Sequence, residues 1–434
     1  MNAQRSAAPA LGPADPPLRR NRDFRTLLVS QSVSAGGDAV SSTALPLLVL
    51  ALTGSGLAMG IVGAVTTGAD FLMGTVAGAF ADRGDRKQMM FLADVGRAAL
   101  TALIPLSDAL HGPTMAVIIL VSAPLAVLRG FFRAGYLAAM PNLVGRSQLA
   151  RGNGILESAY SASFIAGPAI AALLVTAIGP GPTLALDAAS FALSAAGLFL
   201  IRRELKAPPD RPRTRIVDDI REGVEYVAGH PILRTMILLF AFTTTALVSV
   251  GAAMTFRLVR DLGEGPGAFG LTLSGLGVGT LIGALVASRL GPRTNVARFM
   301  VGCLLTMGLP LVAAAAISSL PAIVILTGVS GAGEAALVVV YVSVRAASSP
   351  DALVGRIAST ARTISLGLSP IGSLIGGILI DTVGGTLTVA IMGATLCAVG
   401  LAFSRVDTLR HASLSPDGGH RSGAVLPATE GLEP

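Results

Sequence analysis

The chain is long, apolar and poor in charge. Its 434 residues are 52% hydrophobic and 13% charged, whereas soluble domains carry about 25% charged residues. This composition excludes an ordinary soluble domain and indicates a helical protein that crosses a membrane several times. The net charge of +7 does not indicate a nucleic-acid partner, because the arginines lie in short clusters between apolar runs and read as topology signals.

Twelve apolar runs follow one another along the chain, and we expect each to be a membrane-spanning helix. Before them, residues 1–21 are rich in Ala, Pro and Arg, which predicts a disordered cytoplasmic tail. Each run is close to the ~20 residues that cross a bilayer, or longer. In chain order the predicted spans are 25–52, 57–81, 88–110, 113–134, 148–178, 182–202, 232–257, 267–289, 294–318, 320–346, 356–381 and 385–405.

Charges between the runs predict the orientation. The connections expected on the inner side are basic, and they include Arg83, Arg133, Arg202 and Arg289. The outer turns are nearly bare of charge. Basic residues accumulate on the cytoplasmic side of membrane proteins, so we expect a multi-pass protein of the plasma membrane with both termini in the cytoplasm.

The longest inner loop divides the chain. It begins with a Pro- and Arg-rich linker, after which Ile216, Ile220, Val224 and Val227 recur at helical spacing. This pattern predicts an amphipathic helix on the membrane surface. The expected segments are therefore an N-terminal six-helix bundle, a cytoplasmic linker, a C-terminal six-helix bundle and a disordered cytoplasmic tail, over residues 22–202, 203–231, 232–406 and 407–434.

The two halves repeat weakly. The segment 141–146 corresponds to 350–356, and Gly167-Pro168 in the fifth span corresponds to Ser369-Pro370 in the eleventh. Internal repetition is typical of secondary transporters, which bind substrate between their halves.

Acidic residues near the centres of spans are costly and therefore informative. Asp38, Asp70 and Glu334 hold such positions. A desolvated carboxyl group is easier to protonate near neutral pH, so Asp38 and Glu334 are predicted to exchange protons and contact substrate. The alternative is a buried polar group that specifies packing, and we prefer this for Asp70 on its glycine-rich span. The residues assigned to the proton and substrate site beside the two acids are Gln31, Ser34, Ser330, Tyr341 and Arg129.

Other charged residues in the spans have expected local roles. Asp94 and Arg97 are three residues apart and are predicted to pair with each other. Glu157 and Asp187 lie nearer the ends of their spans and are expected to bind local partners. Two roles stay open for Arg129, which either clamps the turn described next or binds a substrate anion.

The most charge-dense turn separates the second and third spans. Gly78 is expected to let a neighbouring helix approach, and Gly84 to give the turn its freedom. Asp82 is expected to meet a helix N-terminus or an arginine of another span. The residues assigned to this gating loop are Gly78, Asp82, Arg83, Gly84, Arg86 and Lys87.

This turn resembles the signature loop of the major facilitator superfamily, G-x-x-x-D-R/K-x-G-R-R/K, with Asp85 in place of the second glycine. The resemblance implies an all-α membrane protein of twelve transmembrane helices in two pseudo-symmetric six-helix bundles. It also implies alternating access, in which the turn latches the cytoplasmic side. We expect Asp82 to approach the start of the eleventh span near Arg356.

Further motifs narrow the resemblance. Gly167-Pro168 resembles the core of a motif typical of facilitator antiporters, and Gly167 is expected to allow close contact with the eighth span. Gly37-Asp38, Asp94 with Arg97, and the run from Asp187 to Phe191 resemble the macrolide-efflux-like branch of the drug:proton antiporters, which includes siderophore exporters. This implies proton-coupled efflux of a small amphipathic compound, drug or macrolide-like. A siderophore or metabolite exporter, or an importer or uniporter of the same fold, remains open.

Other classes of membrane protein lack their motifs here. An ATP-driven pump needs G-x-x-x-x-G-K-[ST], and neither Lys87 nor Lys206 lies in this pattern. The four histidines are scattered without ligand spacing, so we expect no metal, no cofactor and no enzyme activity. Repeated pore segments of a channel are absent from the sequence. The predicted partners are a small-molecule substrate, protons and the lipid bilayer, and the predicted functional unit is a monomer.

Overall fold

The computed structural model is almost entirely helical over the residues it describes, which are 17–81, 84–112, 115–206, 216–290, 295–350 and 353–405. In the N-terminal half the helices are α1 (Arg22–Thr53), α2 (Gly56–Ala81), α3 (Arg86–His111), α4 (Met115–Val144), the short η1 (Arg146–Gln148), α5 (Leu149–Ile178) and α6 (Pro180–Leu200). After α7 (Ile216–Gly229), the C-terminal half holds α8 (Pro231–Phe256), the π-helical η2 (Arg257–Asp261), α9 (Pro266–Leu290), α10 (Val296–Ala316), α11 (Leu320–Ala347), α12 (Val354–Gly367) and α13 (Ser369–Ser404).

The predicted twelve-helix membrane fold is confirmed. Eleven helical stretches of the described chain are long and apolar enough to cross a membrane. The last of them contains two spans, because Gly384 has φ 83° and interrupts α13. Helix α12 and the first part of α13 form the eleventh span, and the rest of α13 forms the twelfth.

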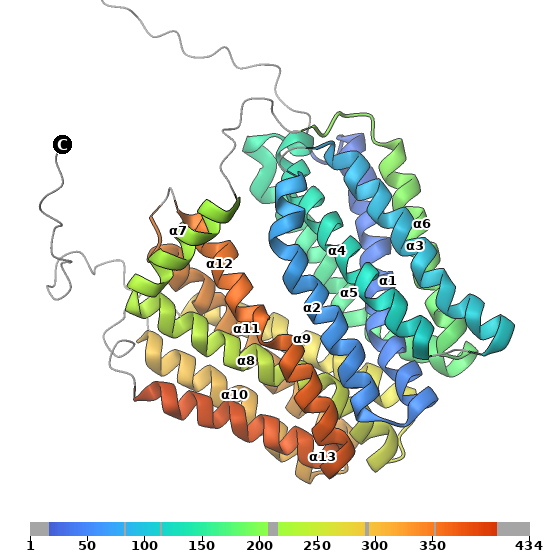
Figure 1. Cartoon of the computed structure of the whole chain (residues 1–434), viewed down its shortest axis with the longest axis vertical. Coiled ribbons are helices and arrows are strands. Elements are labelled where there is room, and N and C mark those ends of the chain that lie inside the picture. Colours follow the sequence, from blue (N-terminus) through green and yellow to red (C-terminus); the bar gives the residue numbers. More distant parts are fainter. Residues whose placement is uncertain are drawn as a thin grey trace, which may run out of the picture.

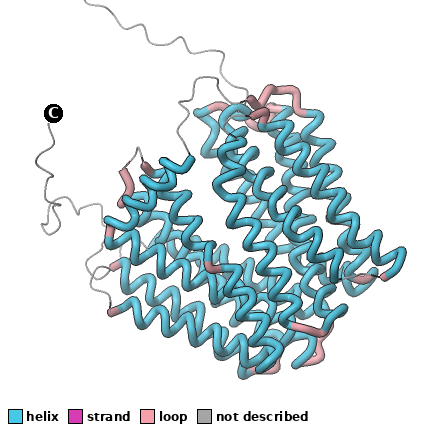
Figure 2. Tube along the Cα trace, viewed as in Figure 1, coloured by secondary structure: helices cyan, strands magenta, loops and turns pink. Residues whose placement is uncertain are grey.

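The helices form two bundles that lie side by side (Figure 1). Helices α1 to α6 make one bundle and α8 to α13 the other, and the two meet where α2 packs on α13 and α5 packs on α9. The bundles converge at the end that holds the α1–α2 turn and diverge toward the end that holds α7. Loops gather at the two ends of the bundles (Figure 2).

Small residues allow the two bundles to touch. A Cβ on Gly60 of α2 would collide with the backbone of α13, and a Cβ on Gly270 of α9 would collide with the Pro168 carbonyl of α5. The sequence places this role on Gly167 itself, but the structure differs. Gly167 faces Ala39 of α1, while Gly270 makes room for the proline carbonyl.

A carboxylate also joins the bundles at their converging end. Asp381 of α13 accepts hydrogen bonds from the Ser55 hydroxyl (2.7 Å), the Gly56 N–H and the Leu57 N–H (3.0 Å). These donors form the N-terminus of α2, where backbone N–H groups lack helical partners and favour negative charge. The halves are therefore held together here by a charged cap as well as by packing.

The predicted amphipathic helix exists as α7, but it lies against the C-terminal bundle. Glu222 pairs with Arg356 of α12, and the Tyr226 hydroxyl donates to the Ser348 carbonyl at 3.1 Å. Val227 is buried, whereas Val224 is exposed. Val227 thus packs against protein while Val224 faces outward, and the position of α7 on the membrane surface stays a prediction.

Candidate functional site

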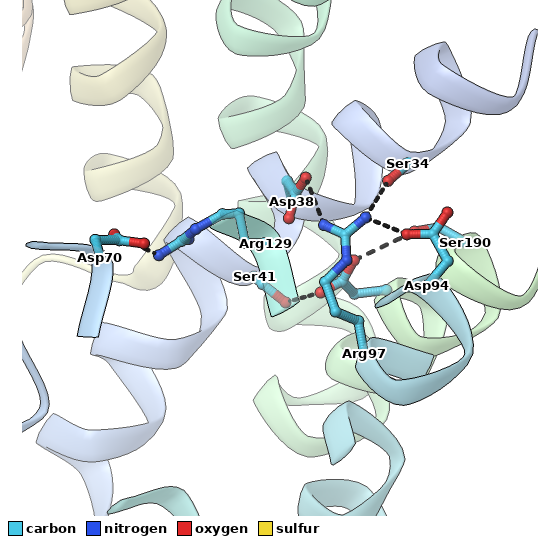
Figure 3. A network of polar contacts seen from close by, with 9 residues as sticks. Ser34, Asp38, Ser41, Asp70, Asp94, Arg97, Arg129 and Ser190 are labelled. Carbon is cyan, nitrogen blue, oxygen red and sulfur yellow. Dashed lines mark hydrogen bonds and ion pairs between the residues drawn. The ribbon is translucent and has the colours of Figure 1, made fainter. Parts of the chain in front are cut away.

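Arg97 of α3 is the centre of a polar cluster inside the N-terminal bundle (Figure 3). Its guanidinium pairs with Asp94 one turn earlier. It also lies 3.6 Å from Asp38 Oδ2 of α1 and donates to Ser34 Oγ of α1 at 3.4 Å. The predicted pairing of Asp94 with Arg97 is confirmed, and the link from this pair to Asp38 and Ser34 is a finding of the structure.

Two aromatic rings hold the Arg97 guanidinium. It lies 4.8 Å from the ring centre of Phe132 and 4.0 Å from that of Phe191. Its side chain is 3% exposed, and that of Asp94 is fully buried. Aromatic faces attract a desolvated cation, and arginine does not lose its proton in proteins. Arg97 is therefore a fixed positive charge within the bundle.

Asp38 is the most exposed of the three carboxylates around Arg97. Its side chain is 40% exposed, in contrast to 3% for Arg97. A carboxylate with one edge at a fixed cation and another edge exposed can gain or lose a proton without unfolding its surroundings. Gln31, assigned to the same site, lies two turns earlier on α1, and its amide nitrogen is buried without a partner in the described part of the chain.

Asp187 of α6 is a third carboxylate that the sequence places among local partners near a span end. The structure instead buries it to 2% exposure within the bundle. It accepts hydrogen bonds from Ser41 of α1 and from Ser190 at 3.2 Å. A Cβ on Gly37 would collide with Asp187 and Ser190, so this glycine lets α6 reach α1. One feature of the sequence could have indicated this buried position, because Asp187 is the sole ionisable residue of α6.

Arg129 of α4 pairs with Asp70 of α2, with Nη2 and Oδ2 2.9 Å apart. The side chains are 47% and 32% exposed, respectively. The described partner of Arg129 is therefore Asp70, and both roles left open by the sequence stay predictions. This pair agrees with the expectation that Asp70 faces a neighbouring helix.

The predicted site residues of the C-terminal bundle do not assemble around Glu334. Ser330 is buried and donates to the Met307 carbonyl of α10 at 3.0 Å. Tyr341 stacks on Phe240 of α8 with ring centres 4.3 Å apart. Both are packing contacts between helices. Glu334 makes no hydrogen bond or ion pair with another described residue, so it is an isolated acid in this half.

The glycines of the gating turn do not act as predicted. A Cβ on Gly78 would meet nothing within 4 Å, so no helix approaches there. Gly84 is not among the described glycines with positive φ, and its N–H donates to the Phe80 carbonyl at 3.0 Å. Asp82 and Arg83 lie outside the described residues, and so does the predicted approach of Asp82 to Arg356.

The basic residues after the turn bind within their own half. Arg86 is buried and donates to the carbonyls of Ala81 (3.0 Å) and Ala138 (2.8 Å). The Lys87 ammonium donates to the carbonyls of Phe199 (3.3 Å) and Ile201 at the end of α6. Cations favour such helix C-termini. In this conformation the described contacts of these two side chains brace the N-terminal bundle, where the sequence predicts charge pairs to the other half.

Residues 14–417 match the sequence model of a family described as transmembrane secretion effectors. The chain belongs to this branch of the major facilitator superfamily. The predicted superfamily membership is therefore confirmed, and the chain is a transporter rather than an enzyme.

Several named transporters are similar to this chain. The multidrug efflux pump Tap of Mycobacterium tuberculosis strain H37Rv is 29% identical over 399 residues, which cover 90% of this chain and 94% of Tap. The enterobactin exporter EntS of Escherichia coli O1:K1 is 26% identical over 288 residues, or 63% and 65% of the two chains. The nucleoside transporter NupG shares the fold, with a TM-score of 0.75 at 12% identity, over 88% of this chain and 98% of NupG.

Proposed function

We propose that this secretion effector exports a small amphipathic compound, drug or macrolide-like, in exchange for protons. It works as a monomer in the plasma membrane, with both termini in the cytoplasm. The observation that carries the proposal is the half-exposed Asp38 carboxylate at 3.6 Å from the buried Arg97 guanidinium. Ionisable groups inside a membrane protein mark ion pathways. The efflux relatives named Tap and EntS support the outward direction.

The chemistry follows from the pairing. When Asp38 is ionised it is attracted to Arg97, and when it gains a proton that attraction falls. Proton binding thus changes which arrangement of α1 and α3 has the lower free energy. A shift between two conformations requires such a difference. Each proton that enters along the membrane potential supplies about 2.3 kcal/mol per 100 mV. Glu334 is the corresponding candidate in the C-terminal bundle.

The two bundles, residues 22–202 and 232–406, are the units that rock in alternating access, joined by the linker 203–231. The predicted topology places the converging end outside and the α7 end in the cytoplasm. The arrangement in Figure 1 then corresponds to a conformation closed to the outside. The Asp381 cap on α2 is a lock of that closed end, and opening to the outside requires its release.

Replacing Asp381 with asparagine is expected to favour the outward-open conformation. The asparagine keeps the size of the side chain but loses the charge at the α2 N-terminus, and hydrogen bonds to charged groups contribute about 1.5–3 kcal/mol. Spin labels on the α1–α2 turn and on the adjoining end of α13 measure the distance. A longer distance population should grow roughly tenfold or more in the variant, and an unchanged distribution would show that Asp381 is no lock.

Reconstitution in liposomes with an imposed pH gradient tests the proposed function. Dyes, macrolides and siderophores are offered as cargo, and transport is followed with the gradient present and after a protonophore collapses it. The proposal predicts gradient-dependent uphill movement of at least one cationic or amphipathic cargo, which the acidic cluster suits. Transport of siderophores alone would favour the EntS-like alternative. Cargo movement insensitive to the gradient in every case would reject proton coupling.

A further inference from the structure

The N-terminal cluster contains more carboxylates than cations. Asp38, Asp94 and Asp187 surround one guanidinium, that of Arg97. If all three carboxyl groups were ionised, the cluster would carry two uncompensated negative charges inside a membrane bundle. Burial of an unpaired charge is so costly that the group normally becomes neutral instead. At least one of these carboxyl groups therefore holds a proton.

The surroundings of each carboxyl group identify which one that is. Asp94 pairs directly with Arg97, and Asp38 has Arg97 at 3.6 Å and a side chain that is 40% exposed. Asp187 is 2% exposed, and no ion pair joins it to another described residue. Its described hydrogen-bond partners are two hydroxyls, of Ser41 and Ser190. A hydroxyl can donate to a carboxylate or accept from a carboxylic acid, so both states of Asp187 fit this pocket.

The helices packed against α6 bring no further cation to Asp187 among the described residues. Helix α1 contributes Asp38 and α3 contributes Asp94 and Arg97, with Asp108 toward the other end of α3 near Gly181. Helix α5 contributes Tyr160, which lies near enough to Asp38 to interact with its charge but is itself neutral at pH 7. The Arg129 guanidinium is already paired with a carboxylate of its own.

We propose that Asp187 is a second, buried proton-binding site of the transporter, connected to Asp38 through the Ser41 hydroxyl. The inference rests on the proposed proton-coupled function and deepens it. Ser41 lies one turn from Asp38 on the same helix and is hydrogen-bonded to Asp187. When the proton moves, Asp187 gives it to Ser41 Oγ, which passes its own proton to Asp38. The Asp187 acid becomes a carboxylate and the Asp38 carboxylate becomes an acid, so charge is conserved.

Infrared spectroscopy of the protein in bilayers detects the proton on Asp187 without a transport measurement. The protein carries ¹³C at its aspartate side-chain carboxyls, which separates their signals from those of glutamates such as Glu334. At neutral pH the wild type should show the carbonyl band of a protonated aspartate, and Asp187→Asn should remove it. Asp108→Asn, on the same helix as Asp94 but outside the cluster, should keep it. Absence of the band in the wild type, or its persistence in Asp187→Asn, would overturn the assignment.

Cargo accumulation provides a second test, because the predicted order of the variants would not be seen if Asp187 had a merely structural role. Asparagine keeps the shape of Asp187 and can bond both hydroxyls, whereas glutamate disturbs the packing but keeps a titratable group. Under a gradient of one pH unit, one exchanged proton supports about tenfold accumulation. Asp187→Asn should lose this accumulation, and Asp187→Glu should regain part of it. Full accumulation by Asp187→Asn, or better function of the amide than of glutamate, would contradict the proposal. A wild type with the infrared band but no response to the gradient would contradict the proposed function and leave the proton site standing.

Discussion

Replacing Asp38 with asparagine is expected to abolish gradient-driven efflux in a protein that still folds. The amide mimics a permanently protonated carboxyl, so the attraction to Arg97 no longer changes during the cycle. With one exchanged proton, a gradient of one pH unit supports about tenfold accumulation of cargo, and the variant should show none. The measurement is cargo uptake into inverted membrane vesicles after acidification of the lumen.

The matched control for this experiment is Glu225→Gln on α7. It makes the same change from carboxyl to amide, but at an exposed residue whose partner is Arg221 of the same helix. Exposed ion pairs contribute little to stability, so uptake should match the wild type. Normal accumulation by Asp38→Asn, at equal amounts of protein, would remove Asp38 from the coupling mechanism.

Removal of the Arg97 charge is expected to give the largest loss of stability in the N-terminal bundle. Arg97→Leu leaves Asp94 buried without its counter-charge, and breaking such a pair costs about 3–5 kcal/mol. Arg97→Lys should be intermediate, because an ammonium keeps the charge but not the flat contact with Phe132 and Phe191. Thermal unfolding in detergent should show the melting temperature fall in the order wild type, lysine variant, leucine variant.

A double variant separates the charge from the packing. In Arg97→Leu with Asp94→Leu, both members of the buried pair are replaced by apolar groups, which is often close to neutral for stability. The double variant should therefore melt above Arg97→Leu. If it melts at the same temperature or lower, the loss comes from the space that Arg97 fills between the rings rather than from an unpaired charge.

The elements of this fold were predictable because membrane spans are defined by local composition. Each apolar run is long enough to cross a bilayer, and the break at Gly384 separates the last two spans as expected. The pairing of Asp94 with Arg97 was predictable for the same reason, since residues three apart on a helix are neighbours.

Contacts between helices were harder to predict because spacing along one helix does not say which neighbour covers a face. Ser330 and Tyr341 share a helix with Glu334, yet α10 and α8 cover them. Asp187 reaches α1 only because Gly37 leaves space there. The relative position of the two halves is a second feature that could not be predicted from the sequence. Arg86 and Lys87 carry the charge that a latch needs. In this conformation, in which the bundles diverge at the α7 end, they donate to backbone carbonyls of α2, α4 and the end of α6.

Counting protons released on cargo binding tests the central claim most directly. The purified protein in weakly buffered detergent solution is mixed with a cargo identified in liposomes, and a pH dye reports the release. The account predicts about one proton per bound cargo from the wild type and none from the double variant Asp38→Asn, Asp187→Asn. Cargo binding by the wild type without any proton release would contradict it.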